Sequence, residues 1–305
     1  MKKTISLLLA LLCAVTALCL TACGEGSSEA AGNTTEILLN GSSAEIKGKG
    51  ASVSGSVVTI TEGGNYTVSG NLDNGQLVVA LAEKEKVVLT LKGADITCMT
   101  SAAIYVKACK KCEIVLADGT DNTLTDGATY QYENALDSEP SACLFSKDDL
   151  KISGSGSLTV NANFNNGIAS KDSLTVESGN ITVTAVNNGI KGKDDVTIEG
   201  GKITVTCGGD AIKSDKSNDL TLGFVEIKGG ELNLKAEDEG IQAETNVLIS
   251  NGSKIVIAAD SNGIKATYSV QISAGSTVEI TAAKEGILGQ TVTGTFVFNG
   301  KTFRY

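Results

Sequence analysis

The sequence predicts an all-β fold, a single-stranded parallel β-helix with about 22–24 residues in each coil. Three observations lead to this prediction. A Gly-Ile pair, replaced once by Ala-Ile, recurs through the second half of the chain, with isoleucines 22, 22, 29, 23 and 23 residues apart. Short alternating apolar runs fill each interval. The 305 residues include 35 Gly and one Pro, and aromatic residues make up only 4% of the chain.

The repeated unit begins at Gly167-Ile168 and last occurs at Gly286-Ile287. Two alternating runs follow each isoleucine, such as Val196-Thr197-Ile198 and Ile203-Thr204-Val205, with a turn at Gly201 between them. Runs of three to five residues with period two are too short for helices and are typical of strands with one buried face. Such short strands bury their apolar sides only when successive units stack into a solenoid.

The N-terminal residues 1–22 have the features of a bacterial lipoprotein signal peptide. Two lysines precede an apolar run, and the ending Leu-Thr-Ala-Cys resembles a lipobox with cleavage before Cys23 and lipid on its sulfur. Ordinary signal cleavage nearby is the alternative. Residues 23–36 are small and polar, as in a flexible tether. We therefore expect a lipid-anchored monomer on the extracellular face of a bacterial membrane.

Residues 37–305 are expected to form the β-helix domain. The part 37–116 is β-rich but less regular, as terminal repeats usually are. Residues 117–141 interrupt the period and carry Tyr130 and Tyr132, so we expect a loop inserted into the solenoid around these positions. Long loops on such scaffolds often carry function.

Composition excludes several kinds of chemistry. The chain has no His, which rules out Ser-His-Asp and Cys-His catalytic units and His-ligated zinc. It has 25 Lys+Arg against 35 Asp+Glu, a net charge of -10 that disfavours nucleic acid as a partner. An acidic excess on an extracellular protein fits metal binding or simple solubility.

Five cysteines remain beyond the predicted signal peptide and lipidation site, an odd number at irregular spacing. Cys109 and Cys112 form a C-x-x-C sequence, but no second pair completes a zinc site. We expect these thiols to be small buried apolar side chains. A Cys109–Cys112 disulfide is the alternative.

The residue after each repeated isoleucine should point outward if the isoleucine points inward. Three lysines take this position and would form a basic stripe on an acidic protein: Lys191, Lys213 and Lys265. Aromatic residues that could stack on a ligand are few, and the best candidates are Tyr130, Tyr132 and Phe145. Phe145 could equally pack beneath the inserted loop.

Carboxylate and amide side chains recur two residues before and four residues after the repeated isoleucines. Unpaired carboxylates stacked roughly 5 Å apart repel each other, so something must compensate their charge. Ca²⁺ is the economical answer because it accepts about six to eight oxygen ligands. The alternative is that these residues serve only as turn formers. The predicted calcium ligands are Asp148, Asp149, Asn166, Asp172, Asn188, Asp194, Asp195 and Asp210.

Several of these blocks resemble the bacterial carbohydrate-binding β-helix family, whose members are secreted or lipid-anchored. The resemblance rests on Asn-Asn-Gly-Ile-Lys at 187–191, Gly-Asp-Ala-Ile-Lys at 209–213, Asp-Glu-Gly-Ile-Gln at 238–242 and Ser-Lys-Asp-Asp-Leu at 146–150. It implies a right-handed parallel β-helix, similar to pectate lyases, with bound calcium and affinity for cellulose-like and acidic polysaccharides. Members often read Asp-Asp-Gly-Ile-Lys where this chain has Asn-Asn, a change that could weaken one calcium position.

Three functions are compatible with these features. The first is a cell-surface polysaccharide binder, in which Ca²⁺ bridges uronate carboxylates while Lys191, Lys213 and Lys265 pair with others. The second is a calcium-dependent polysaccharide lyase with Lys191 or Lys213 as the base. The third is a non-catalytic spacer or adhesin. We favour the binder, because the sequence has no signature of a deep cleft.

Overall fold

The structure is a computed structural model and describes residues 34–132, 134 and 136–305. Over these residues all regular structure is β-strand, in 32 strands, which confirms the all-β prediction. No helix in this range is long and apolar enough to cross a membrane. The predicted signal peptide, Cys23 and most of the predicted tether lie outside the described residues. Strand β1 begins at Thr35, within the last residues of that tether.

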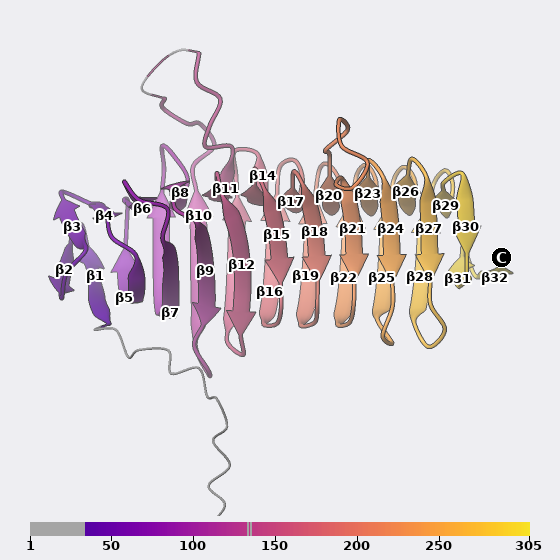
Figure 1. The fold of residues 1–305 in the computed structure, drawn as a ribbon, viewed down its shortest axis with the longest axis horizontal. Helices are drawn as coiled ribbons and strands as arrows, with labels where there is room; N and C mark the ends of the chain where they lie inside the picture. The colour runs from indigo at the N-terminus through magenta and orange to yellow at the C-terminus, as the bar shows by residue number, and fades with distance from the viewer. Residues whose placement is uncertain (1–33, 133, 135) are drawn as a thin grey trace, which may run out of the picture. The chain divides into compact units, whose positions relative to one another are not determined.

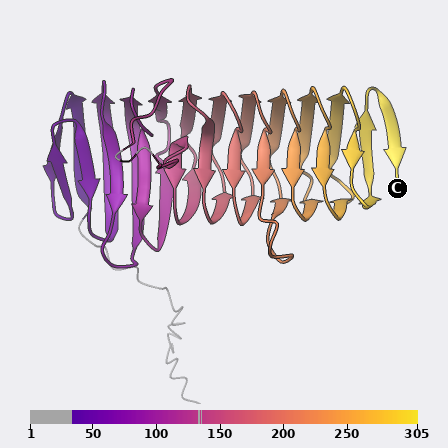
Figure 2. The same cartoon turned by 90° about the horizontal axis from the view of Figure 1, so that it is seen from above.

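The strands stack coil upon coil, with parallel pairing between equivalent strands of successive coils. One coil consists of β17 (Ile190–Gly192), β18 (Asp195–Ile198) and β19 (Lys202–Cys207). Each of these strands pairs in parallel with the strand three positions earlier and three positions later in the chain. Figure 1 shows these coils side by side, and Figure 2 shows them from above.

The strands fall into two sheets. The smaller sheet, here called sheet 2, has eleven strands in the order β29-β26-β23-β20-β17-β14-β11-β8-β6-β4-β3. Its remaining members are β3 (Ala51–Ser54), β4 (Val57–Ile60), β6 (Gln76–Ala80), β8 (Ile104–Ala108), β11 (Ala142–Ser146), β14 (Asn166–Ser170), β20 (Ile212–Ser214), β23 (Ile241–Ala243), β26 (Ile264–Ala266) and β29 (Ile287–Leu288).

The larger sheet, sheet 1, has 21 strands. Its N-terminal members are β1 (Thr35–Gly41), β2 (Ala44–Lys47), β5 (Gly64–Leu72), β7 (Lys86–Cys98), β9 (Lys111–Leu116) and β10 (Asp121–Asp126). From β15 to β28, a range that includes β18 and β19, shorter strands alternate with longer ones. The shorter are β15 (Ser173–Val176), β21 (Phe224–Ile227), β24 (Asn246–Ile249), β27 (Ser269–Ile272), β30 (Thr291–Thr293), β31 (Thr295–Phe298) and β32 (Lys301–Arg304). The longer are β12 (Asp149–Gly154), β13 (Ser157–Ala162), β16 (Asn180–Ala185), β22 (Glu231–Ala236), β25 (Lys254–Ala259) and β28 (Thr277–Ala282).

The repeated isoleucines face the core, as the alternating pattern predicts. Five of them are fully buried: Ile168, Ile190, Ile212, Ile241 and Ile264. They stack in register along sheet 2, and the inward residues of sheet 1 pack against them in one continuous apolar core. Antiparallel pairs end the stack, β1 with β2 at the N-terminal end and β31 with β32 at the C-terminal end.

Packing across this core explains why the first residue of the repeated pair is glycine. A Cβ at Gly189 would lie 2.3 Å from Val205 Cγ1 and 2.7 Å from the Ala211 carbonyl oxygen. The equivalent contacts at Gly167, Gly240 and Gly263 are 2.2–2.3 Å from a Val or Ile methyl. Real side chains do not approach so closely, so the β-branched residue opposite leaves room only for glycine.

The inserted loop is shorter than the predicted 117–141. Residues Asp121–Asp126 form β10, which pairs in parallel with β7 and β13, so the excursion covers 127–141. The five cysteines of the described residues are free and buried, among them Cys109 and Cys112. Burial raises the pKa of the Cys109 thiol to about 12, which makes it a weak nucleophile.

Candidate functional site

Two loops flank a groove over the outer face of sheet 2. The loop 127–141 precedes β11, and the loop 215–223 lies between β20 and β21; both stand out from the coils in Figure 1. The groove between them has a volume of about 480 Å³. Its lining includes Lys171, Lys191 and Lys193, with Asp215 and Lys216 from the second loop. A groove of this size lies within the roughly 300–1,000 Å³ range of small-molecule sites.

The three predicted lysines stack as expected but are engaged by carboxylates. Lys191 pairs in register with Lys213, while Gln242 separates Lys213 from Lys265. The ion-pair distances are 2.7 Å for Lys191–Asp215, 2.6 Å for Lys213–Asp210 and 3.1 Å for Lys265–Glu239. The expected basic stripe is thus a row of ion pairs, partly exposed to solvent.

The Asn residues before the isoleucines form a hydrogen-bonded ladder. Asn188 Nδ2 donates to Asn166 Oδ1 at 2.8 Å, and Asn166 Nδ2 donates to the Ser141 carbonyl at 2.8 Å. The Asp210 backbone N–H donates to Asn188 Oδ1 at 3.0 Å. Because both amides donate and accept within the ladder, Asn166 and Asn188 act as structural residues that also tie down the end of loop 127–141.

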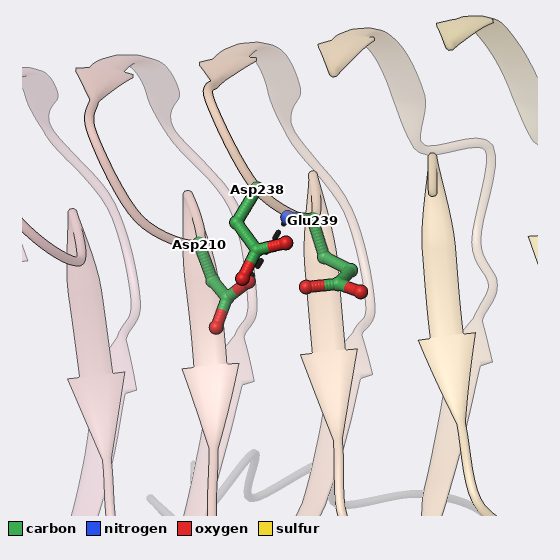
Figure 3. Close-up of side chains that lie close together, drawn as sticks. All are labelled: Asp210, Asp238 and Glu239. Carbon is green, nitrogen blue, oxygen red and sulfur yellow. Dashed lines mark hydrogen bonds between the residues drawn. The ribbon is translucent and has the colours of Figure 1, made fainter. Parts of the chain in front are cut away.

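A carboxylate cluster lies at the end of this ladder, formed by Asp210, Asp238 and Glu239 (Figure 3). One oxygen of each lies within 4.8 Å of the others. Asp210 is 1% exposed and Glu239 is 4% exposed. Glu239 donates its backbone N–H to Asp210 Oδ1 at 3.0 Å, which fixes adjacent coils against each other. Asp238 comes from the exposed turn immediately before Glu239.

The carboxyl groups of this cluster outnumber the ammonium groups that pair with them. Burial raises the pKa of the Asp210 carboxyl, although Lys213 opposes the shift. The hydrogen bond with Glu239, together with burial, raises the pKa of Asp238. Burial also opposes ionisation of Glu239, but hydrogen bonds from its neighbours hold its pKa below the usual range. When all three carboxyl groups are ionised, three negative charges face two ammonium groups, those of Lys213 and Lys265.

Gln242 lies on the same coil as Asp238 and Glu239 and carries a buried side-chain oxygen. Its side chain lies in register between Lys213 and Lys265 and is 8% exposed. Its Nε2 donates to Glu244 at 3.2 Å, whereas its Oε1 is buried and accepts no hydrogen bond from any described residue. A buried oxygen without a donor is costly unless a ligand or water satisfies it.

The aspartates after the isoleucines form a second acidic column, along the turns that follow sheet 2. Lys84 pairs with Asp148, and Lys216 pairs with Asp194 at 2.9 Å. Burial raises the pKa of Asp172, and the charges of Asp194, Asp149 and Asp148 raise it further. Burial and the charges of Asp194 and Asp149 likewise raise the pKa of Asp195, whose carboxylate also accepts a hydrogen bond from Ser173.

Asp172→Asn is expected to stabilise the calcium-free protein by a few tenths to about 1 kcal/mol at pH 7, the usual size for partly exposed charges. A carboxyl whose pKa is raised on folding contributes most below the unfolded pKa of about 4, and that contribution is lost as pH rises through the folded value. The gain should therefore vanish near pH 3.5. Urea unfolding in EDTA at both pH values measures it, with exposed Asp121→Asn as control. A less stable variant at pH 7 would contradict the repulsion.

The candidate aromatic residues stabilise the loop 127–141. Tyr130 stacks on Phe164 with ring centroids 4.1 Å apart, and its hydroxyl donates to Asp126 at 2.6 Å. The Tyr132 hydroxyl donates to the Pro140 carbonyl at 3.0 Å. The Phe145 ring is 1% exposed and packs edge-on against Tyr105, so it lies at the base of this loop.

Of the predicted calcium ligands, only Asp210 belongs to the convergent carboxylate cluster. The remaining members, Asp238 and Glu239, were not predicted as ligands, although Asp-Glu-Gly-Ile-Gln recurs in phase with the repeat. The groove lysines Lys171, Lys193 and Lys216 were also missed, because their meeting depends on the two loops.

The groove, the carboxylate cluster and the aspartate column lie on a chain that matches known proteins over most of its length. The family model for carbohydrate-binding domain-containing proteins matches residues 54–302. The chain belongs to this family. A carbohydrate-binding domain-containing protein from Acetivibrio thermocellus is 46% identical over 244 residues, 78% of this chain and 85% of that protein.

A solved structure shares the fold of this member of the carbohydrate-binding family. It is the polysaccharide lyase-like protein from C. thermocellum, studied as a gadolinium derivative. The two chains are 37% identical with a TM-score of 0.73, and the match covers 87% of this chain and 97% of the other. The family match over residues 54–302 includes the coils that carry the groove.

Proposed function

We propose that this protein is a non-catalytic polysaccharide-binding lipoprotein that presents the outer face of sheet 2 to acidic or cellulose-like glycans. The observation that supports this most directly is the groove between the loops 127–141 and 215–223, on a chain of the carbohydrate-binding family. The groove concentrates lysines on a protein of net charge -10. Its polar and charged side chains suit a hydroxyl- and carboxylate-rich ligand.

We further propose that the stacked coils form a right-handed, single-stranded parallel β-helix. In this arrangement equivalent side chains repeat at about 4.8 Å, the spacing of paired strands. A linear face of repeating polar groups suits a linear polymer, because several weak contacts along one chain raise the overall affinity. Such a face needs no deep cleft.

Calcium is the proposed cofactor, and the carboxylate cluster of Asp210, Asp238 and Glu239 is the place that fits it best. The three carboxylates converge from two coils and exceed the charge of their two lysines by one. Hard oxygen donors of this kind are what Ca²⁺ prefers. Calcium bound there would supply a positive charge for a sugar carboxylate.

The aspartate column is a second proposed calcium position. Asp149, Asp172 and Asp195 have no ion-pair partner among the described residues, and mutual repulsion contributes to the raised pKa values of Asp172 and Asp195. A cation would relieve that repulsion. Asn166 and Asn188 do not fit as ligands, because the ladder already uses their amide groups.

Residues 1–36 suggest how the domain is displayed. We propose that cleavage leaves Cys23 as a lipidated N-terminus and that the polar residues after it serve as a tether. The protein would then be a monomer held at the extracellular face of a bacterial membrane.

A polysaccharide lyase is the second candidate, favoured by the likeness to the polysaccharide lyase-like protein. The proposed bases argue against it: Lys191 and Lys213 are paired with Asp215 and Asp210 at 2.7 and 2.6 Å. A general base must lie within hydrogen-bond reach of the proton that it removes, and both amines are instead directed at carboxylates of the protein. A product with new ultraviolet absorption from polygalacturonate would nonetheless establish the lyase.

The proposal is tested by native gel electrophoresis of residues 34–305 in gels that contain polygalacturonate or a soluble cellulose derivative, with Ca²⁺ present. We expect strong retardation in at least one of these gels relative to a glycan-free gel. A non-binding protein of similar size and charge serves as the reference. Unchanged mobility in every glycan gel would contradict binding and leave the spacer or adhesin function.

A further inference from the structure

The lysines that line the groove outnumber its carboxylates, and not every lysine has an ion-pair partner among the described residues. Four lysines and two carboxylates line it, a net charge of +2 on an acidic protein: Lys171, Lys191, Lys193, Lys216, Glu139 and Asp215. Lys171 pairs with Glu139, Lys191 with Asp215 at 2.7 Å, and Lys216 with Asp194 at 2.9 Å. Across the described ranges, Lys193 forms no ion pair and no side-chain hydrogen bond. One ammonium in the groove therefore lacks an anion.

The carboxylates of the groove come from the loops, whereas most of its lysines come from the stacked coils. Glu139 belongs to the loop 127–141 and Asp215 to the loop 215–223, while Lys191 projects from β17 on the floor. The Lys191 and Asp215 side chains are 26% and 29% exposed. Both side chains of this pair remain in contact with water, so an incoming carboxylate can reach Lys191 and exchange with Asp215.

We propose that the groove binds the carboxylate of a uronate residue through Lys193, and that Asp215 is an internal competitor that occupies Lys191 when no glycan is bound. This inference rests on the proposed function and names the sugar chemistry recognised in the groove. A uronate next to Lys193 gains a second ammonium when it displaces Asp215 from Lys191. The loop carboxylate thereby keeps the floor lysine neutralised in the free protein and weakens binding of anions that make only one contact.

Isothermal titration calorimetry of residues 34–305 with trigalacturonate in Ca²⁺ tests this assignment. Lys193→Ala is expected to weaken binding about tenfold, the typical loss for one charge-assisted hydrogen bond, and Lys193→Arg to retain most of the affinity. Lys193→Gln, which preserves more of the packing, should behave as Lys193→Ala does. Lys202→Ala, on sheet 1 and away from the groove, is the matched control and should bind as the wild type does.

The Asp215→Asn variant tests whether Asp215 competes with the glycan for Lys191 or supports glycan binding. The amide keeps the shape but releases Lys191, so trigalacturonate should bind about three- to tenfold more tightly at low salt. Exposed Asp95→Asn should leave the affinity unchanged. Cellotriose, which has no carboxylate, should show no dependence on Lys193 or Asp215. Thermal unfolding of each variant verifies that the fold is retained.

Each alternative result overturns a distinct statement. Wild-type protein that binds trigalacturonate while Lys193→Ala binds it within twofold would place the uronate elsewhere and leave the proposed function intact. Weaker binding by Asp215→Asn would make Asp215 a supporting residue and end the competitor role. Wild-type protein that binds neither trigalacturonate nor the polymers would overturn the proposed function itself.

Discussion

Gly189→Ala is expected to lower the free energy of unfolding by about 1–3 kcal/mol, the usual cost of overpacking a core. The added methyl would lie 2.3 Å from Val205 Cγ1 and 2.7 Å from the Ala211 carbonyl oxygen. Both neighbours belong to the stacked coils, so relief requires two strands to move apart. Chemical denaturation of the domain, followed by circular dichroism at several urea concentrations, measures the loss.

One repeat of this chain has alanine at the position of the repeated glycine. Ala211 replaces glycine in one repeat, and the register places Leu234 in that coil where Val205 stands in the preceding coil. Leucine branches one carbon further out and leaves space for the methyl. The double variant Gly189→Ala/Val205→Leu should therefore recover part of the lost stability.

Gly289→Ala is the control, because a Cβ there would have its nearest atoms at 3.5–3.6 Å and the backbone needs no left-handed conformation. Alanine at this position should be neutral or stabilise by up to about 1 kcal/mol. Equal stability of Gly189→Ala and Gly289→Ala would show that the repeated glycine is not held by packing.

Removing two carboxylates of the convergent cluster is expected to lower calcium affinity at that site by at least about 100-fold. Asp238→Asn/Glu239→Gln replaces two anionic ligands with neutral amides of the same shape, and ligand charge sets the affinity of a Ca²⁺ site. Calorimetric titration with CaCl₂ measures the affinity, and the number of sites should fall by one. Glu237→Gln, in the same turn but exposed, is the matched control.

The double variant also distinguishes a metal site from a row of ion pairs. If the carboxylates only neutralise Lys213 and Lys265, their removal leaves calcium binding unchanged and lowers stability instead. An unaltered calcium stoichiometry in Asp238→Asn/Glu239→Gln would therefore contradict the assignment of Ca²⁺ to this cluster.

The stacking of coils could be predicted from the sequence because one inward isoleucine and its glycine recur with each coil. β10 was missed because its inward face is mostly polar. Only Leu124 gives the alternating signal there, while the buried Asn122 and Asp126 on either side, each 1% exposed, resemble loop residues. Asn122 accepts from the Ala94 backbone N–H and Asp126 from Tyr130, so partners distant in sequence make these polar residues acceptable inside.

The site was predictable only where it follows the repeat. The column of Lys191 and Lys213 was found because both occupy the same place in successive coils. The partner of Lys191 was not, since Asp215 lies in a loop outside the period, whereas Lys213 pairs with Asp210 of the repeat itself. Asp238 was not predicted as a calcium ligand for a related reason. It belongs to a turn, and only the fold brings its carboxylate close to that of Asp210 on the neighbouring coil.

The most direct test of the proposed function is the affinity of wild-type residues 34–305 for polygalacturonate, measured in saturating Ca²⁺ and again after EDTA treatment. We expect strong retention with Ca²⁺, a loss of at least about tenfold in affinity after chelation, and full recovery when Ca²⁺ is restored. Affinity that is the same with and without EDTA would contradict the calcium-assisted mechanism.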